Sequence, residues 1–325
     1  MAQYASVVRP DITVVTSIGS EHHRSMRSLE ATCAEKAEMV RSLRASGLAV
    51  LNGDDPNVRG MAGQTVARVV TFGFDEANDV RAGDVSLTDW PYGTRFTLHA
   101  GGESRPVRIR QVGRTMVYPA LAAVAVGLAE GLSLDKIVPL LETIAPAPGR
   151  LEPIQLPSGA VILRDDYKSS METVEAALEA LREIPAKRRI VVLGEVSEPP
   201  GPQGEIYRYI GARIARVASR AIFLCRERNS ACRAGATGAG MPPSSIFKAG
   251  KDLFKATEIL RKQLGPGDVA LIKGRDIQRL DRMTLMLQGR TVKCRIPSCK
   301  AQPLRCRECP ALQCGWGSST VMSIH

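Results

Sequence analysis

The sequence predicts an α/β protein in three parts: a parallel-sheet domain, a Rossmann-like domain with a second parallel sheet, and a small cysteine-rich tail. Apolar, β-branched runs alternate with helical spacings over most of the 325 residues, which is the pattern of parallel sheets. Residues 145–159 hold four prolines and two glycines, and five of the eight cysteines lie in the last 37 residues. We therefore expect domains at 1–147 and 148–288 and a tail at 289–325.

The first domain opens with a strand, a helix and a strand. Residues 11–19 form an apolar run that ends at a glycine, which predicts a buried strand. Residues 28–47 have helical spacing, with Ser28 as a weak cap and Gly47 at the end, and 48–52 predict a second buried strand. Residues 66–110 alternate and predict a smaller antiparallel section. Two helices follow up to residue 144, and Gly131 closes the first.

The second domain repeats a strand–helix rhythm. Strands are predicted at 160–167, 189–196, 220–225 and 268–274, with helices at about 171–184, 205–219 and 252–264. The first helix begins with a capping box, Ser169 as N-cap and Glu172 three residues on. Asp165, Asp166 and Lys168 therefore lie between a strand end and a helix N-terminus, where open α/β sheets bind ligands. The alternative is a solvated loop.

Composition describes a soluble globular protein with a formal charge of +11. The charge indicates either an anionic partner, such as a nucleotide, a phosphorylated substrate or nucleic acid, or a generally basic surface. No apolar run reaches the ~20 residues that cross a bilayer, and the N-terminus has no apolar core of signal-peptide length. We therefore expect a cytoplasmic protein without a membrane partner.

Seven motifs, in order, resemble those of the Mur ligase family, ATP-dependent enzymes that join a carboxylate to an amine as peptidoglycan precursors are built. They are PDITVVTSIGSEH (10–22), SLEATCAEKAEM (28–39), VLNGDDP (50–56), GRLE (149–152), DDYKSSMETVEAALEAL (165–181), VVLGEVSE (191–198) and LIKGRDIQRLDR (271–282). The branch that adds D-alanyl-D-alanine is the most similar. The resemblance implies amide formation through an acyl phosphate, with a nucleotide and a small carboxylate–amine substrate pair as partners.

The resemblance also implies a Mg²⁺ site. His22 matches a histidine that ligates the ion, and Lys36 matches a lysine that carbon dioxide carbamoylates. The carbamate supplies oxygens, which Mg²⁺ prefers, and the metal would stabilise the charge of the acyl phosphate. Without the resemblance, both side chains would be solvated surface residues. His23 has no matching role.

For ATP, the resemblance implies four residues of the second domain. Arg150 would contact the phosphates, Asp166 the ribose, and Lys168 the γ-phosphate side, while Lys273 would face the cleft. Asn52 lies in a matching motif of the first domain, where a simple turn after a strand is the alternative.

The sequence departs from the family in its phosphate-binding and adenine-binding motifs. No G-x-x-x-x-G-K-S/T motif occurs in the 325 residues. In GRTMVYPA, Met116 and Pro119 stand where the family has asparagines that meet the adenine. Either a truncated reading of a longer gene or a diverged relative explains these differences. We expect the chain alone to bind ATP weakly and to show no ligase turnover.

The tail carries the spacing C-x4-C-x6-C-x2-C-x4-C. It predicts one tetrahedral Zn²⁺ bound by Cys294, Cys299, Cys306 and Cys309, with Cys314 as a spare. An iron–sulfur cluster is the second interpretation, because Pro310 follows Cys309, and free thiols are the third. A rival function is a non-catalytic binding protein whose basic tail holds nucleic acid or a protein partner, which we favour less.

Overall fold

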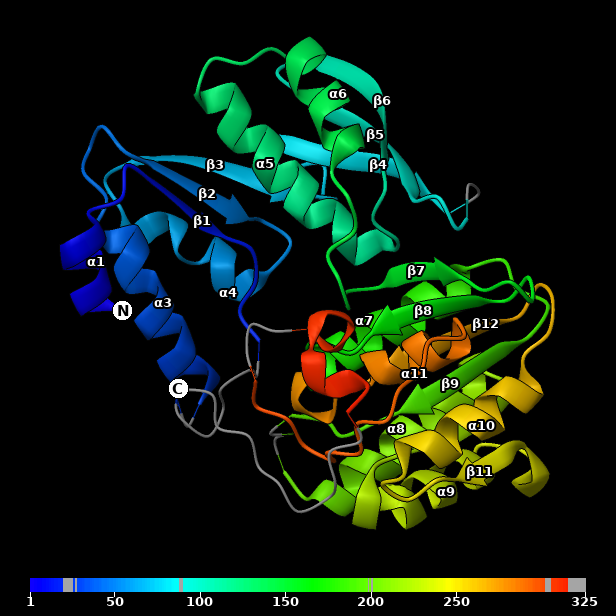
Figure 1. Cartoon of the computed structure of the whole chain (residues 1–325). Helices are drawn as coiled ribbons and strands as arrows, with labels where there is room; N and C mark the ends of the chain where they lie inside the picture. Colours follow the sequence, from blue (N-terminus) through cyan, green and yellow to red (C-terminus); the bar gives the residue numbers. More distant parts are fainter. Residues whose placement is uncertain are drawn as a thin grey trace. The chain divides into compact units, whose positions relative to one another are not determined.

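The computed structural model describes the chain except for residues 20–25, 27, 88–89, 198, 200, 302–304 and 315–325. The chain divides into two compact units, Met1–Ala145 and Pro146–His325. Each contains one six-stranded sheet, mostly parallel, with helices on both faces (Figure 1). The predicted α/β class is confirmed.

The first unit has the sheet order β1-β2-β3-β4-β5-β6. Strands β1 to β4 are parallel, whereas β5 and β6 are added antiparallel. The predicted antiparallel section over 66–110 is confirmed for β4, β5 and β6, but it was wrong for β3, which extends the parallel part. The strands are β1 (Ile12–Val15), β2 (Leu48–Asn52), β3 (Arg68–Gly73), β4 (Val80–Ser86), β5 (Thr94–Ala100) and β6 (Glu103–Ile109), and the helices are α1 (Ala2–Val8), α3 (Leu29–Arg41), α4 (Pro56–Arg59), α5 (Val117–Ala129) and α6 (Leu134–Thr143).

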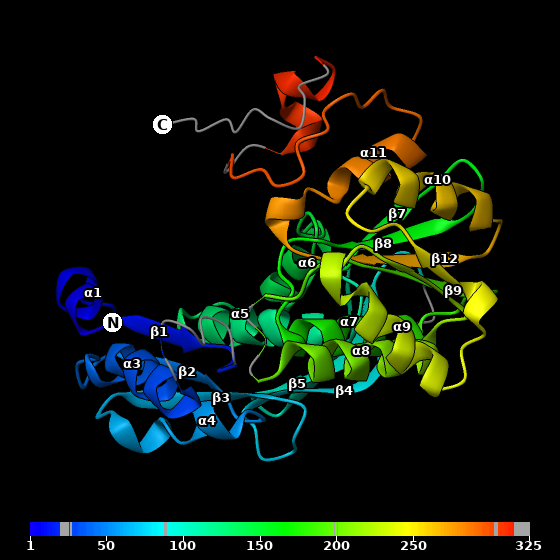
Figure 2. The same cartoon turned by 90° about the horizontal axis from the view of Figure 1, so that it is seen from below.

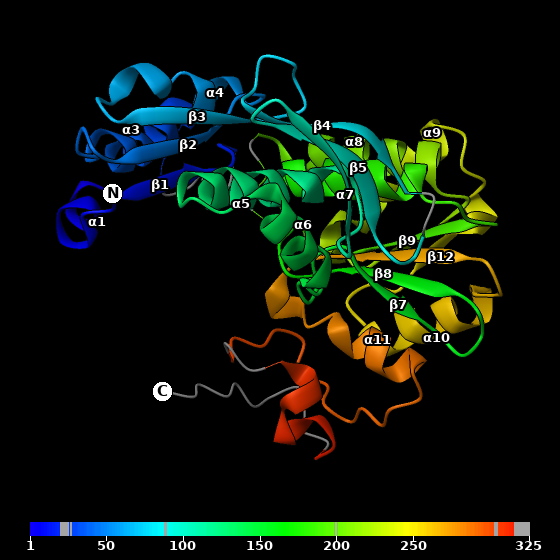
Figure 3. The ribbon, with the colours of Figure 1, turned by 90° about the horizontal axis from the view of Figure 1, so that it is seen from above.

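Strand β2 shows why this sheet is covered on both faces. All five of its residues are buried. Leu48 and Val50 join the core beneath α5 and α6, while Ala49 and Leu51 join the core beneath α3 and α4. Because neighbouring residues of a strand point to opposite faces, a continuous apolar run requires helices on both sides. Figure 3 shows α3 and α4 on one face and α5 on the other.

The second unit has the sheet order β11-β10-β9-β12-β8-β7, with only β7 antiparallel. Helices α10 and α11 cover one face, and α7, α8 and α9 cover the other (Figure 2). The strands are β7 (Glu152–Gln155), β8 (Val161–Asp165), β9 (Arg189–Leu193), β10 (Arg220–Phe223), β11 (Ile246–Lys248) and β12 (Val269–Lys273), and the helices are α7 (Met171–Glu183), α8 (Gln203–Val217), α9 (Asn229–Gly238), α10 (Leu253–Gln263) and α11 (Asp281–Leu287).

The predicted capping box of α7 was wrong. The helix begins at Met171, so Ser170 and not Ser169 is the N-cap, and its side chain makes no capping hydrogen bond. The hydroxyl of Ser169 is buried without a hydrogen-bond partner among the described residues. Instead, the carbonyl of Ser169 accepts from the backbone N–H of Ser197 (2.7 Å), which ties this turn to the loop after β9.

Helix α9, which the sequence did not predict, packs closely against α8. A Cβ added at Gly235 would lie 1.8 Å from the carbonyl oxygen of Arg208, and one added at Gly211 would lie 2.0 Å from that of Cys232. Glycine at both positions therefore allows the two backbones to approach. None of the helices in the described ranges is both long and apolar enough to span a membrane.

Candidate functional site

The first unit gathers polar groups beyond the carboxyl end of β2, around Asp54. Its carboxylate accepts hydrogen bonds from the backbone N–H of Phe74 (2.6 Å) and Asp75 (3.1 Å), from Asn78 Nδ2 (2.9 Å) and from Tyr118 Oη (3.0 Å). Burial alone would raise the pKa of Asp54, but these bonds outweigh it and the pKa lies below its ordinary value. The carboxylate thus joins the turn after β3 to helix α5.

The side-chain amide of Asn52 is hydrogen-bonded within the same turn. Its Nδ2 donates to the carbonyl of Thr16 (2.8 Å), and its Oδ1 accepts from the backbone N–H of Asp54 (3.0 Å). The carboxylate of Asp55 caps α4 and also accepts from the backbone N–H of Ile18 (2.8 Å). These contacts are those of a turn that fastens β1 to β2, and they engage both polar ends of the Asn52 amide.

Only one of the two predicted Mg²⁺ residues falls in the described part of the chain. Lys36 is exposed in the middle of α3. His22 lies outside the described residues. The buried face of that helix carries Ala37 and Val40, so the amine of Lys36 lies on the solvent side.

In the second unit, an ion pair joins the carboxyl ends of two neighbouring strands. Lys273 ends β12 and is paired in register with Asp165, which ends β8. Its Nζ donates to Asp165 Oδ2 (2.7 Å) and to the carbonyl of Lys168 (2.6 Å). Lys273 is only 1% exposed. Burial lowers the pKa of Lys273, although Asp165 opposes that shift. The pair fixes the loop that follows β8.

A second buried network surrounds Arg164, one residue earlier. Its guanidinium contacts Asp166 Oδ1 (2.9 Å), Glu152 Oε2 (3.2 Å) and Asp281 Oδ2 (3.8 Å). The side chain of Asp166 is 4% exposed. Burial raises the pKa of Asp166 to about 7, with Arg164 opposing the shift and Asp281 adding to it. Asp166 therefore lies inside the unit rather than at its surface.

The turn that precedes β7 closes over this network. Gly149 has φ +72°, and a Cβ there would lie 2.6 Å from Asp166 Oδ1. Its carbonyl accepts from the backbone N–H of Tyr167 (3.2 Å). The next residue, Arg150, is exposed, and its guanidinium lies 4.7 Å from the centre of the Tyr167 ring. The guanidinium of Arg305, from the tail, lies 5.0 Å from the same ring.

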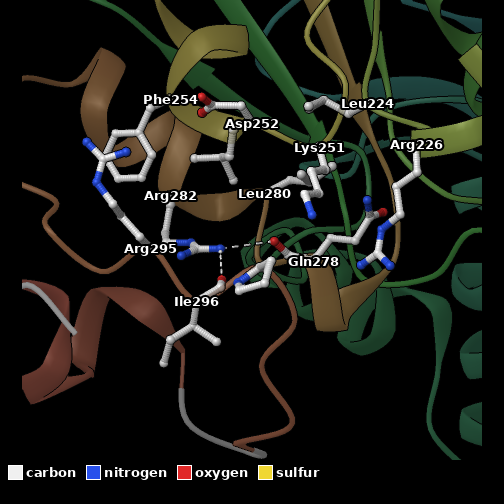
Figure 4. A pocket seen from close by; sticks show the side chains of 12 residues that line it. Leu224, Arg226, Lys251, Asp252, Phe254, Gln278, Leu280, Arg282, Arg295 and Ile296 are labelled. Atoms are coloured by element: carbon white, nitrogen blue, oxygen red, sulfur yellow. Dashed lines mark hydrogen bonds between the residues drawn. The ribbon is translucent and has the colours of Figure 1, made fainter. Parts of the chain in front are cut away.

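A cavity of about 360 Å³ opens farther along the same edge of the sheet (Figure 4). It is bounded by the residues that follow β10 and β11, by the turn after β12 and by the start of the tail. Three exposed cations line it: Arg226, Lys251 and Arg295. Arg226 pairs with Glu195 (2.6 Å), and Arg295 lies over the ring of Phe254 (4.2 Å). Asp252 adds one carboxylate to the wall, so the lining combines three exposed cations, one carboxylate and apolar side chains.

The four predicted zinc ligands of the tail line one cavity of about 290 Å³. They are Cys294, Cys299, Cys306 and Cys309, whereas Cys314 does not line it. Among the described residues, however, no three side chains of His, Cys, Asp or Glu lie close enough to share a metal ion. The structure therefore gives no support to a single zinc ion held by all four thiolates.

Four of the residues predicted to bind ATP lie near one another at the end of β8. Arg150, Asp166, Lys168 and Lys273 come together there. The buried partners Glu152, Arg164 and Asp281 were missed. Glu152 lies in a proline-rich segment that is typical of a linker, and Asp281 lies on a short helix more than a hundred residues away. Only Arg164 gave a signal, as a charge at the end of an otherwise apolar run.

Two family models match the chain. The model of the Mur ligase middle domain matches residues 1–127, and that of the Mur ligase glutamate ligase domain matches 149–275. A UDP-N-acetylmuramoyl-tripeptide–D-alanyl-D-alanine ligase from Mycobacterium bovis is 32% identical over 293 residues, which are 84% of this chain and 57% of that relative. The ligase of the same name from Escherichia coli K12 is 31% identical over 202 residues, 61% of this chain and 44% of the relative.

The chain thus spans a little over half the length of the curated relative from Mycobacterium bovis. Among solved structures, the MurF ligase from Thermotoga maritima in complex with ADP matches with a TM-score of 0.75 and 21% identity. The match covers 89% of this chain and 64% of that one. MurF from Acinetobacter baumannii gives a TM-score of 0.74 at 24% identity, over 89% of this chain and 62% of the other. Because each match covers 89% of this chain, the fold of both units is similar to that of these structures.

Proposed function

Because the chain belongs to the Mur ligase family, we propose that it serves ATP-dependent formation of an amide bond between a carboxylate and an amine, in the synthesis of a cell-wall precursor. The observation that carries the proposal is the edge of the second unit's sheet at the end of β8. There a turn holds Arg150 beside the aromatic ring of Tyr167, next to a loop that contains Lys168. Such a cationic edge before a helix N-terminus suits the phosphates of ATP.

The residues at this edge differ in exposure, and we assign their roles accordingly. Arg150 and Lys168 would contact phosphate directly. Lys273 would act as a positioning residue, because its ammonium group is buried against Asp165 and holds the carbonyl of Lys168. A ribose contact by Asp166 would require Arg164 to release its carboxylate. For that reason we give Asp166 a structural role first and the ribose contact second.

For Mg²⁺, the proposal rests on the first unit. Lys36 is exposed, so its amine is accessible to carbon dioxide, and a carbamate there would supply the oxygen ligands that Mg²⁺ prefers. His22 would be the second ligand. When bound, the ion would stabilise negative charge on the transferred phosphate and the acyl phosphate. As for the family, we propose a cytoplasmic location.

The basic cavity of Figure 4 suits the carboxylate end of the amine substrate. The matched relatives are named for joining D-alanyl-D-alanine, which ends in a carboxylate. Arg226 and Lys251 offer cations on one wall, and Phe254 and Leu280 offer apolar surface for a small side chain. Arginine and carboxylate form the paired hydrogen bonds that such recognition needs.

A photoreactive ATP analogue tests the nucleotide edge. We expect it to label peptides that contain residues 160–170, and we expect Arg150→Ala to lower the labelling severalfold. Arg182→Ala is the matched control, because Arg182 is an exposed arginine of α7 that pairs with Glu179 away from this edge. Equal labelling of parent, variant and control would reject the assignment of this edge to ATP.

Turnover is a separate measurement on the same protein. Without the G-x-x-x-x-G-K-S/T motif, and with Met116 and Pro119 in the adenine motif, the 325-residue chain should form no amide product from UDP-muramoyl-tripeptide, D-alanyl-D-alanine and ATP. Mass spectrometry of the reaction detects the product. Product formed by the chain alone would show that another surface binds the phosphates. The binding-protein alternative is less favoured, since Arg295 and Arg305 of the tail already lie against Phe254 and Tyr167.

A further inference from the structure

We propose that the tail binds an iron–sulfur cluster through Cys294, Cys299, Cys306 and Cys309. The site goes beyond the proposed ligase reaction. The two matched family models cover residues 1–127 and 149–275, so neither includes any of these cysteines. In Figure 1 the tail is the orange-to-red segment that follows α11.

The first observation is the cavity that the four cysteines share. Its volume of about 290 Å³ is far larger than one metal ion needs. The rest of its wall combines apolar side chains such as Ile296 and Leu312 with the cations Arg279 and Lys300. Four cysteines around a space of this kind, shielded by apolar groups and balanced by cations, suit a multi-atom anionic centre.

The second observation concerns the spacing of the thiols in space. A zinc ion keeps its four sulfurs at about 2.3 Å, which brings them to within about 4 Å of one another. Among the residues that the structure describes, no such group of three or more ligands exists. An iron–sulfur cluster places iron and sulfide between the thiolates, so its four cysteines stand farther apart around a larger core. A single ion therefore has no ready set of ligands in the described residues, whereas the cavity that the four cysteines share has room for a cluster.

The third observation is that the backbone of the cysteines is already anchored to the second unit. Arg282 is 3% exposed, and its Nη1 donates to the carbonyl of Cys294 (2.9 Å). The backbone N–H of Cys299 donates to a carbonyl in the turn before α11 (2.8 Å), and that of Cys306 donates to Asp281 Oδ2 (3.2 Å). Three of the four ligands are thus fixed to one short stretch of chain, which prepares the site before the metal binds.

The fourth observation is an unpaired buried donor at the cavity. Arg279 lines the cavity and is 3% exposed, and its Nε has no hydrogen-bond partner among the described residues. A buried guanidinium N–H without an acceptor is destabilising. The sulfur atoms of a cluster accept hydrogen bonds of this kind, which also tune its potential. The sequence agrees in part, because Cys306 and Cys309 have a C-x2-C spacing and a proline follows Cys309, although in bacterial ferredoxins the cysteine before the proline follows an x3 spacing.

The test is metal and sulfide analysis of the full chain, purified under anaerobic conditions. We expect iron and acid-labile sulfide in equal amounts, about four of each for a 4Fe–4S core, together with visible absorption that reductant bleaches. A preparation that has lost its metal should regain both on incubation with ferrous iron and sulfide. One zinc per chain without sulfide would overturn the proposal, and so would a chain that takes up neither.

Cysteine variants locate the site. Cys309→Ser and Cys299→Ser, both at half-buried positions, should lose most of the iron and sulfide. Cys314→Ser is the matched control, because Cys314 belongs to the same tail but is exposed and does not line the cavity. Circular dichroism of each variant separates loss of metal from loss of fold. Equal iron in all three variants, or equal loss in all three, would reject the assignment.

Discussion

Replacing Asp166 by asparagine should change how the stability of the second unit depends on pH. The buried interior at the end of β8 holds four carboxylates, those of Glu152, Asp165, Asp166 and Asp281, around two cations. With so few cations, burial favours a proton on one of the carboxyl groups. The pKa of Asp166 accordingly rises from its ordinary 3.8 to about 7.

The sign of the effect follows from where the proton resides. Between pH 4 and 7 the folded chain holds a proton on Asp166 that the unfolded chain has lost, so stability falls as the pH rises through this window. Each pH unit contributes up to about 1.4 kcal/mol, which gives about 4 kcal/mol over the whole window. Asparagine cannot ionise, and its oxygen can still accept the hydrogen bond from Arg164. We therefore expect Asp166→Asn to be more stable than the parent by about 2 kcal/mol at pH 5 and by about 4 kcal/mol at pH 9.

Hydrogen exchange in urea, read by mass spectrometry on peptides of α7, measures the second unit by itself. Asp268→Asn is the control of opposite sign, because hydrogen bonds from Arg188 and Gly265 outweigh burial and lower the pKa of Asp268. The ionised carboxylate of Asp268 stabilises the fold above pH 4, and this stabilisation is lost as the pH falls through the folded pKa. The free energy of unfolding of Asp268→Asn should therefore differ from that of the parent by a constant amount between pH 5 and 9. A constant difference for Asp166→Asn as well would refute the reasoning, since it would mean that Asp166 is already ionised at pH 5.

Two further predictions concern packing and the first unit. Gly235→Ala should destabilise the second unit by about 2–3 kcal/mol, because the added Cβ would meet the backbone of α8. Gly238→Ala is the control on the same helix, because open space surrounds that position and the added Cβ should not destabilise the unit. Thermal unfolding of the two variants measures the difference. Tyr118→Phe removes a hydrogen bond to the carboxylate of Asp54 and should lower stability by about 1–3 kcal/mol at pH 7. Because the pKa of Asp54 lies below its ordinary 3.8, that loss should stay constant from pH 7 to 5 and shrink only below about pH 4, and a loss that already shrinks between pH 7 and 5 would contradict this account.

The sequence alone predicted those elements whose pattern of apolar residues lies within one short segment. Strand β8 and helix α7 have clear periodicities, and these alone place the loop between them, with Asp165, Asp166 and Lys168, at the edge of the sheet. The meeting of Lys273 with that loop also follows from sequence, because parallel strands end at the same edge. In contrast, β7 lies in a proline-rich segment and α9 is rich in alanine and glycine, so neither carries the large apolar side chains that mark an element.

What the sequence could not supply was the pairing of charges. Asp166 has the position of a solvent-facing ligand, yet it is buried because Arg164 points to the same interior and Gly149 allows the preceding turn to close over it. Asn52 likewise has the position of a site residue, yet both ends of its amide are engaged in the turn. Both outcomes depend on neighbours that are distant in sequence, and burial of a charged side chain is decided by those neighbours rather than by residue type.

The tail and the edge of the sheet are joined by two continuous sets of contacts. In one, the backbone of Cys306 is hydrogen-bonded to Asp281, whose carboxylate faces Arg164, which in turn holds Asp166. In the other, Arg305 lies against the same aromatic ring as Arg150. A metal centre that fixes the position of Cys306 would therefore also fix the carboxylate of Asp281 and the guanidinium that precedes Cys306. Since these groups border the proposed phosphate-binding edge, the loading of the tail and the shape of that edge depend on the same side chains.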